Sequence, residues 1–499
     1  MIDGGIFLGR NPRNGRSLAA ADILRHLDAQ GAGPGIVSSY KAVFFDDREG
    51  NEEVMRLARR HPERVIPAVT FNARRFDASA DGGYLSGLRE RGARVFGVYA
   101  EPCYYDVEWA SPLLMAAVRE AASLGYVIQF GVKNERDLAE VLRLYSDVKA
   151  PVLVRWMGGG AYRALAESIH AARTLPNFYF DTASLTGAGM IAHFAGAAGA
   201  DKLYWASNAP EQFAMAGRFV LEASGVDAKE KDRILSGTLA SILGVRPADK
   251  KSPVSALFRK FSAIPKIDTH WHLEHWNLIE PGKDEKGFAA VLKQSSVRKA
   301  VFSSIRALNG EMAEGNRAAF RFASQNRGIF ALVVVDPTLP KASLAEIRRY
   351  AKHKRCAGVK TIQDLYRLGL GDAEYAPILR AAEQNDLTVM AHLPGMAEAA
   401  QKNPGLRFVA AHATYARAKN LFALPNVYFD LATSHRNVSE TSFERFLAGA
   451  GEGRLLFASD APLIHPAWTA GKLAEAGFST GTLRRIFWEN ARKAFPRLR

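Results

Sequence analysis

The sequence predicts an α/β protein made of two tandem (β/α)8 TIM barrels. Three observations support this fold class. The chain has 499 residues, roughly twice the length of one such barrel. Its C-terminal half alternates short apolar runs with helical patterns, and its N-terminal half repeats the same landmarks. We expect one barrel over residues 1–245, a linker over 246–263 that includes a short amphipathic helix near 254–261, and a second barrel over 264–499.

Eight apolar runs predict the strands of the second barrel. They are rich in Val, Ile, Phe and Ala, and helical patterns such as residues 373–384 separate them. This alternation is typical of repeated βα units, whose parallel sheet is buried on both faces. The runs lie near residues 264–268, 299–304, 329–335, 357–362, 388–393, 408–412, 427–432 and 455–460. Eight βα units close a barrel, and the carboxyl ends of its strands form one rim.

A repeat between the two halves predicts a duplicated domain. The halves match at an offset of 265 residues, and the match resumes after gaps nearer the end of each half. A repeat on this scale indicates two tandem copies rather than a solenoid of short units. The aligned segments are 2–3 with 267–268, 38–39 with 303–304, 175–181 with 424–430, and 205–210 with 457–462.

Two histidines near the first run of the second half suggest a metal site. His270 and His272 are two residues apart, so a β-strand presents both imidazoles on one face and Trp271 on the other. Three later runs also end in candidate ligands, namely His392, His412 and Asp460. Because the strand ends of a barrel converge on one rim, we expect all five side chains to meet around one metal ion.

These residues, in this order, resemble the amidohydrolase superfamily. The resemblance covers residues 262–499 and is closest to the branch that includes aminocarboxymuconate-semialdehyde decarboxylase. It implies one divalent metal ion, with zinc as the expected metal, and an acid/base role for His412 beside it. The metal ligands that it implies are His270, His272, His392 and Asp460. The motifs that carry it are Asp268-Thr269-His270-Trp271-His272, His392, His412, Ala458-Ser459-Asp460-Ala461-Pro462 and Glu489-Asn490-Ala491-Arg492.

The chemistry of these residue types agrees with a catalytic metal. Three neutral imidazoles and one carboxylate leave a +1 centre with room for water or a substrate oxygen, as in catalytic zinc sites. A bound metal of this kind acidifies its water and polarises a carbonyl group. An ordinary histidine titrates near pH ~6.5, so His412 could exchange protons near neutrality, together with Asp460.

Four further side chains are candidates for substrate binding. Lys360 closes the fourth run, where some amidohydrolases carry a carboxylated lysine that bridges two metals. We expect a single metal, and therefore a role for Lys360 at the rim or against the substrate. Arg306 follows the second run, and His435 and Arg436 follow the seventh. Each could hold a substrate carboxylate through charge-assisted hydrogen bonds.

The first copy lacks the metal-site residues. The expected ligand positions hold Gly5, Phe7, Phe130, Trp156 and Asn208. Aromatic side chains at such positions would fill the space that a metal and substrate need, so we interpret the first copy as a degenerate barrel. It could pair with the second copy as an intrachain pseudo-dimer, and a homo-oligomer stays an alternative.

Charge and hydropathy limit the partners. Residues 1–250 hold 30 Lys and Arg against 29 Asp and Glu, a net charge of +1, while the rest of the chain holds 36 against 22, a net charge of +14. The basic half fits attraction of a small carboxylate-bearing substrate and fits an ordinary solvated basic surface equally well. No nucleic-acid motif and no membrane-length apolar run occur. The first strand begins within two residues of Met1, and Cys103 and Cys356 suit reduced thiols. We therefore expect a cytoplasmic protein.

Three functions fit the sequence. The first is a metal-dependent hydrolase of an amide or lactone bond. The second is a nonoxidative decarboxylase that uses the same metal site, and the ligand set does not separate the two. The third, from another class, is a non-catalytic binding or scaffold protein.

Overall fold

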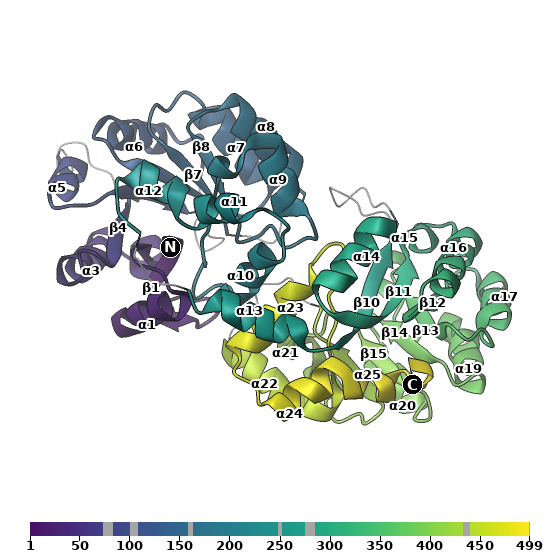
Figure 1. Cartoon of the computed structure of the whole chain (residues 1–499). Coiled ribbons are helices and arrows are strands. Elements are labelled where there is room, and N and C mark those ends of the chain that lie inside the picture. Colours follow the sequence, from purple (N-terminus) through teal and green to yellow (C-terminus); the bar gives the residue numbers. More distant parts are fainter. Residues whose placement is uncertain are drawn as a thin grey trace. The chain divides into compact units, whose positions relative to one another are not determined.

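The computed structural model describes residues 1–72, 83–99, 108–157, 163–247, 252–274, 285–432 and 440–498. The chain divides into two compact units, Met1–Phe258 and Arg259–Arg499. Each unit is an α/β arrangement with its strands inside and its helices outside (Figure 1). Residues 248–251, between the two predicted barrels, lie outside the described part. Helix α13 (Val254–Ala263) follows them and contains the predicted amphipathic segment.

The C-terminal unit contains an eight-stranded sheet in which strand order follows chain order. All neighbouring strands are parallel. The strands are β10 (Lys266–Leu273), β11 (Val297–Ser304), β12 (Ile329–Val334), β13 (Cys356–Thr361), β14 (Thr388–Ala391), β15 (Phe408–Ala410), β16 (Val427–Asp430) and β17 (Leu455–Leu456). Each of the eight predicted runs therefore overlaps one of these strands.

Backbone hydrogen bonds join the first strand of this sheet to the residues at and after the last. Thr269 N donates to Phe457 O at 3.1 Å, and Asp460 N donates to His270 O at 2.8 Å. His272 N donates to Ala461 O at 2.7 Å. The sheet is thus nearly closed, which is consistent with a TIM-barrel fold.

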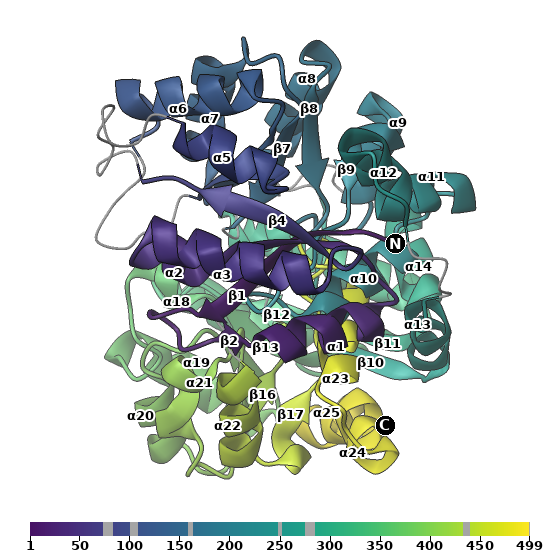
Figure 2. The same cartoon turned by 90° about the vertical axis from the view of Figure 1, so that its left-hand side faces the viewer.

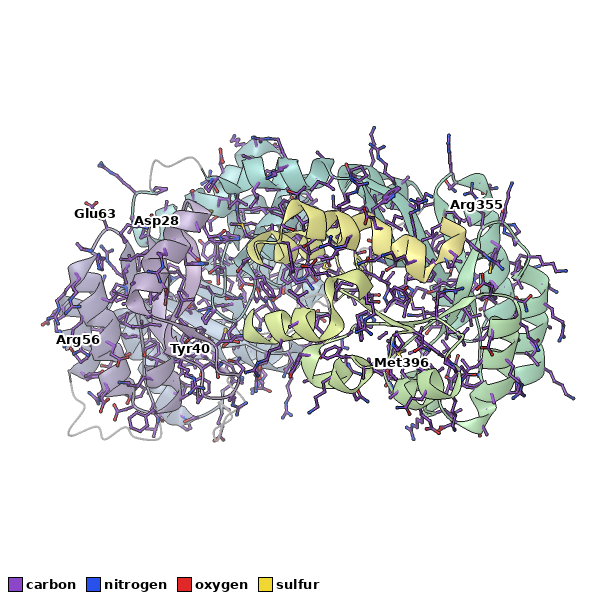
Figure 3. All side chains as sticks on the ribbon, turned by 90° about the horizontal axis from the view of Figure 1, so that it is seen from below. Asp28, Tyr40, Arg56, Glu63, Arg355 and Met396 are labelled. Atoms are coloured by element: carbon purple, nitrogen blue, oxygen red, sulfur yellow. The ribbon has the colours of Figure 1, made fainter. Side chains whose placement is uncertain are left out.

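Helices follow most strands of the C-terminal unit and cover the outside of its sheet (Figure 1). Amphipathic sequences such as that of α16 (Met312–Gln325) explain this placement, since such a helix buries one apolar face. The main helices are α14 (Glu285–Gln294), α16 (Met312–Gln325), α17 (Pro340–Tyr350), α19 (Ala376–Gln384), α20 (Met396–Lys402), α22 (Glu440–Ala450), α23 (Pro466–Glu475), α24 (Thr480–Arg484) and α25 (Asn490–Ala494). Met396, at the start of α20, is fully buried (Figure 3).

The interior of the C-terminal unit is apolar near the start of its strands. Ile267 and Val301 there share one buried cluster with Phe495 and Leu498 from the end of the chain. These residues fill the space between the strands from the amino end. The candidate site lies at the opposite, carboxyl ends of the strands.

The N-terminal unit contains a nine-stranded sheet, of which eight strands are parallel and follow chain order. The ninth, β2 (Ser17–Leu18), pairs antiparallel with β1. The parallel strands are β1 (Asp3–Arg10), β3 (Gly35–Ser39), β4 (Val65–Thr70), β5 (Val95–Tyr99), β6 (Val127–Val132), β7 (Val152–Trp156), β8 (Phe178–Asp181) and β9 (Leu203–Tyr204). Gly4 N donates to Trp205 O at 2.9 Å, and Phe7 N donates to Ala209 O at 2.8 Å.

Helices surround these strands as well (Figure 2). They include α1 (Ala20–Gln30), α2 (Tyr40–Phe44), α3 (Asp47–Arg60), α5 (Tyr84–Glu90), α6 (Pro112–Ser123), α7 (Glu135–Tyr145), α8 (Leu165–Thr174), α9 (Met190–Ala198), α10 (Ala214–Glu222), α11 (Ala228–Asp232) and α12 (Thr238–Leu243). Arg56 lies on the exposed face of α3 (Figure 3). None of the helices in the described part of the chain has the length and apolar character that a membrane span needs.

Candidate metal centre

His270 and His272 both lie in β10 and are buried. Their Nε2 atoms are 3.2 Å apart, so the two imidazoles share one face of the strand. Trp271 points to the opposite layer, where its ring centroid lies 4.4 Å from that of Phe288 in α14. The predicted alternation along this strand is therefore confirmed.

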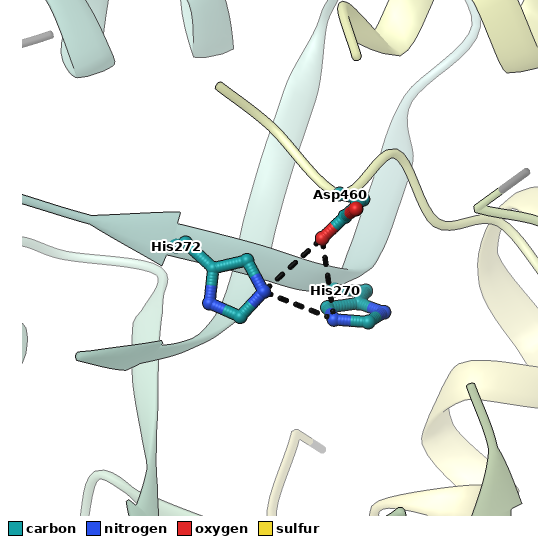
Figure 4. Close-up of side chains that lie close together, drawn as sticks. All are labelled: His270, His272 and Asp460. Atoms are coloured by element: carbon teal, nitrogen blue, oxygen red, sulfur yellow. Dashed lines mark hydrogen bonds and ion pairs between the residues drawn. The ribbon is translucent and has the colours of Figure 1, made fainter. Parts of the chain in front are cut away.

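Asp460 brings a carboxylate to the two histidines (Figure 4). Its Oδ1 lies 3.1 Å from His272 Nε2 and 3.5 Å from His270 Nε2. The residue has a φ of 68°, a left-handed backbone conformation that lies four residues after the end of β17. Burial raises the pKa of Asp460, but the charges of His412, His272 and Lys360 outweigh it and hold this pKa below its usual value.

His412 lies beside this cluster. It also has a left-handed φ, of 54°, and its backbone N donates to Asp430 Oδ1 at 2.8 Å. Its Nδ1 lies 2.6 Å from Ala432 O, so Nδ1 carries the proton and Nε2 is the free nitrogen. That Nε2 lies 4.0 Å from Asp460 Oδ2. The ring centroid of His412 is 4.8 Å from that of His270.

His392 is held near the cluster but at a greater distance. Gln363 accepts from its backbone N at 2.9 Å and donates to its carbonyl at 3.0 Å. The ring centroids of His392 and His412 are 5.2 Å apart. Among the described residues, the groups with metal-ligand spacing are His270 with His272 and Asp460, and His270 with His412 and Asp430; neither contains His392. Burial, reinforced by Lys360 and His412, lowers the pKa of His392 to about 4.

Each of the four histidines has its Nδ1 atom engaged by the chain itself. The partners are Asp430 Oδ2 for His270 at 2.8 Å, Ser303 Oγ for His272 at 3.1 Å, Asp364 Oδ2 for His392, and Ala432 O for His412 at 2.6 Å. Such partners fix the orientation of an imidazole and leave Nε2 for a metal or a proton. Burial, with the charge of Lys360, keeps the pKa of His270 well below its ordinary value, so this ligand candidate is neutral.

Sequence reasoning missed Asp430 as a member of the site. The same residue type recurs as Asp181 in the first half, which lacks the expected ligands, so the recurrence alone indicates an architectural role. In the structure Asp430 is fully buried, and its two oxygens contact both His270 and the backbone of His412. Its position at the end of β16, beside strands that end in histidines, is the sequence signal that could have revealed it.

Lys360 lies deeper than a rim residue. Its side chain is fully buried near the end of β13, and its Nζ is 3.2 Å from His270 Nε2. Burial lowers the pKa of Lys360 to about 8, although Asp430 and Asp460 oppose the shift. A buried amine therefore lies directly against a candidate metal ligand.

The structure does not bring Arg306 to this cluster. Its guanidinium is half exposed and lies 3.5 Å from Glu311 and 3.4 Å from Glu314. His435 and Arg436 lie outside the described residues, as does Cys103. Cys356 is a free, buried thiol whose pKa burial raises to about 11.

In the N-terminal unit, two aromatic residues at the aligned positions have different surroundings. Phe7 is buried with Tyr40 and Tyr99. Phe130, in contrast, packs against Tyr145 of α7, with ring centroids 4.7 Å apart. Phe130 was expected to fill the position of a lost ligand, and this was wrong, because its side chain faces the helix layer.

The donor set of the C-terminal unit fits a divalent metal. His270 Nε2, His272 Nε2 and an Asp460 oxygen lie within 4.8 Å of one another. Imidazole nitrogens and a carboxylate oxygen are the ligands of catalytic zinc sites and of related transition-metal sites.

Comparison with known proteins assigns this half of the chain to a family. Residues 267–497 match the amidohydrolase family model. No curated protein matches the chain. Similar solved structures include an amidohydrolase from Burkholderia multivorans (16% identity, 47% of this chain and 99% of that one, TM-score 0.40). They also include the 5-carboxyvanillate decarboxylase of Novosphingobium aromaticivorans with bound manganese (15% identity, 47% of this chain and 97% of that one, TM-score 0.37).

A third similar structure is the 2,6-dihydroxybenzoate decarboxylase of Rhizobium (11% identity, 46% of this chain and 98% of that one, TM-score 0.40). The family match and the near-closed parallel sheet agree over the same residues. The C-terminal half of the chain therefore carries an amidohydrolase domain of the amidohydrolase superfamily.

Proposed function

We propose that the C-terminal unit is a metal-dependent hydrolase of a small, carboxylate-bearing amide or lactone. The observation that carries this proposal is the cluster of His270, His272 and Asp460, with His412 Nε2 facing the same carboxylate at 4.0 Å. In the proposed site these ligands, together with His392, hold one divalent metal. Zinc is the expected metal, which when bound supplies an activated water and polarises a carbonyl group.

His412 is the proposed acid/base. Its Nδ1 proton is held by Ala432 O, so Nε2 is the atom that takes a proton from the attacking water. Asp460, at 4.0 Å from that nitrogen, stabilises the imidazolium that forms. His412 can then return the proton to the leaving nitrogen or oxygen.

Lys360 is the proposed partner of the substrate carboxylate. In the structure Lys360 Nζ contacts His270 Nε2, the atom that a metal would take. With that nitrogen engaged, the buried ammonium needs another acceptor, because a buried cation without one is strongly unfavourable. A substrate carboxylate beside the reacting carbonyl would serve as that acceptor.

A nonoxidative decarboxylase is the second candidate. It is favoured by the same pair of features, since Lys360 can orient a carboxylate and His412 can deliver a proton to the carbon that loses CO2. A non-catalytic role of the whole chain is the third, and a chain that purifies without metal and binds none would favour it.

One experiment separates these functions. Metal content is measured on protein purified without chelator, and lactones, amides, and aromatic or enoic acids are then screened as substrates. In 18O-labelled water a hydrolase incorporates the label into its product, whereas a decarboxylase releases CO2 and incorporates a solvent proton at carbon. Activity that is unchanged after complete metal removal contradicts the metal-dependent reaction.

We also propose that the two units are complete barrels from a tandem duplication, the first of which has lost its metal site. Matching hydrogen bonds support this. Asn51 exchanges two bonds with the backbone of Thr70, and Asn316 does the same with Val334.

A further inference from the structure

Arg155 is fully buried in the N-terminal unit, near the carboxyl end of β7. The next residue, Trp156, donates its backbone N to Asp181 Oδ2 at 3.2 Å. In the C-terminal unit His412 N donates to Asp430 Oδ1 in the same way. Arg155 thus corresponds to Ala411, the residue that precedes His412. In (β/α) folds this end of the strands is where ligands bind.

The surroundings of Arg155 accommodate its guanidinium closely. Its Cζ lies 4.5 Å from the ring centroid of Phe7. A Cβ added to Gly5, the residue aligned with His270, would lie 2.4 Å from this Cζ, so only glycine leaves room for the guanidinium. Arg155 Nε donates to Asn208 Oδ1, and Asn208 is aligned with Asp460. A guanidinium therefore lies where the other unit has its ligand cluster.

Two nitrogens of this guanidinium lack acceptors in normal hydrogen-bond geometry. Arg155 is fully buried, and neither Nη1 nor Nη2 makes a hydrogen bond of normal geometry within the described ranges, although the Tyr99 hydroxyl interacts with the guanidinium. Asn208 has an amide where the other unit has the carboxylate of Asp460. Its Nδ2 donates a hydrogen bond to Asp181 Oδ2 at 3.4 Å. Buried donors without acceptors are costly, especially on a cation.

We propose that Arg155 forms a metal-independent binding site for a small carboxylate in the N-terminal unit. Nη1 and Nη2 of the guanidinium form a planar fork that matches the two oxygens of a carboxylate. The rings of Phe7, Tyr40 and Tyr99 exclude water around it, which strengthens such a pair. This site is independent of the reaction proposed for the C-terminal unit.

The test uses the full-length chain, freed of metal, in a Lys360→Met background that removes the buried cation of the C-terminal unit. Acetate, benzoate and inorganic phosphate are titrated by calorimetry. We expect one carboxylate per chain. Arg155→Met should weaken this binding by about 10- to 100-fold, the effect of losing a charge-assisted pair. Arg155→Lys should give an intermediate loss, because a lysine lacks the fork.

Asn208→Asp is the second variant, and it decides the outcome if Arg155→Met does not fold. It adds a carboxylate of equal size beside Arg155 Nε, so it should also weaken carboxylate binding while circular dichroism stays unchanged. Equal affinity in the parent and in Asn208→Asp, or no binding of any probe to the metal-free parent, would overturn the proposal. Binding of phosphate without binding of acetate or benzoate would overturn the assignment to a carboxylate.

Discussion

The two units share their framework and differ at its centre. Asp3 and Asp268 each accept two backbone N–H groups, one from their own strand and one from the segment after the last strand. Asn208 and Asp460, which follow the last strands, both have a left-handed backbone, with φ of 53° and 68°. Side chains that join strand ends by hydrogen bonds are thus present in both units, whether or not the unit carries the imidazole cluster.

Asp181 and Asp430 show that a shared residue can have two roles. Both accept a backbone N–H from the end of the preceding strand. Asp430 also contacts His270 Nδ1 at 2.8 Å, whereas Asp181 contacts Asn208 Nδ2 at 3.4 Å. Recurrence in both units therefore identifies a framework residue without excluding a role in the site. The side chain that each carboxylate contacts, His270 for Asp430 and Asn208 for Asp181, decides whether the residue also has a role in the site.

The largest effect is expected from removing the histidines of β10. The double variant His270→Ala with His272→Ala should lower the metal content from about one ion per chain to near zero, and turnover to background, because two neighbouring ligand atoms are lost. Phe7→Ala, at the position aligned with His272, is the matched control and should retain the metal. Elemental analysis measures the metal content of the histidine variant and of the control. Two ions per chain in the parent would instead favour a carboxylated Lys360 that bridges two metals.

His412→Ala should separate metal binding from chemistry. If His412 is an acid/base, the variant retains most of the metal while turnover falls by about 10²- to 10⁴-fold. Metal content and rate are measured on the same preparation. Parallel loss of metal and activity would show that His412 is instead a required ligand, as its place in a second group with metal-ligand spacing allows.

The strands and the order of the ligand candidates could be predicted from the sequence. The alternation of side chains along a strand and the approximate ends of the apolar runs both follow from local patterns. Predicted runs at 408–412 and 455–460 end earlier as strands, at Ala410 and Leu456. The left-handed residues His412 and Asp460 follow these strand ends by two and four residues, and sequence alone does not reveal their backbone conformation. The depth of Lys360 and the hydrogen bond of Asp430 also depend on tertiary contacts between strands far apart in the chain.

Asp430→Asn should have a smaller effect than loss of a ligand. The variant keeps an oxygen for the backbone N–H of His412 but removes the charge that orients His270, so metal affinity should fall by about 10- to 100-fold. Asp181→Asn is the matched change in the other unit and should leave metal affinity unchanged. Competition with a fluorescent chelator measures both affinities. An equal effect of the two variants would contradict a direct role of Asp430 at the metal.

The smallest expected effect concerns a buried lysine that one unit has and the other lacks. Lys266, aligned with Met1, is buried, and its Nζ donates to Phe261 O at 2.6 Å, Ile264 O at 2.8 Å and Ser295 O at 3.2 Å. Burial lowers its pKa to about 7 from the usual 10.5. Between these values the unfolded chain binds more protons at this residue than the folded chain does.

The free energy of unfolding of the C-terminal unit should therefore rise with pH between about 7 and 10.5, with Lys266 contributing up to about 1 kcal/mol per pH unit. Below that range the lysine is charged in both states, and this contribution is lost. Lys266→Met, which introduces the residue found in the first unit, should reduce the slope and stabilise the protein most at low pH. Urea unfolding of parent and variant at pH 6.5 and 9 measures the difference. Identical pH dependence in the two proteins would mean that Lys266 stays charged in the folded state and that its three carbonyl partners compensate for burial.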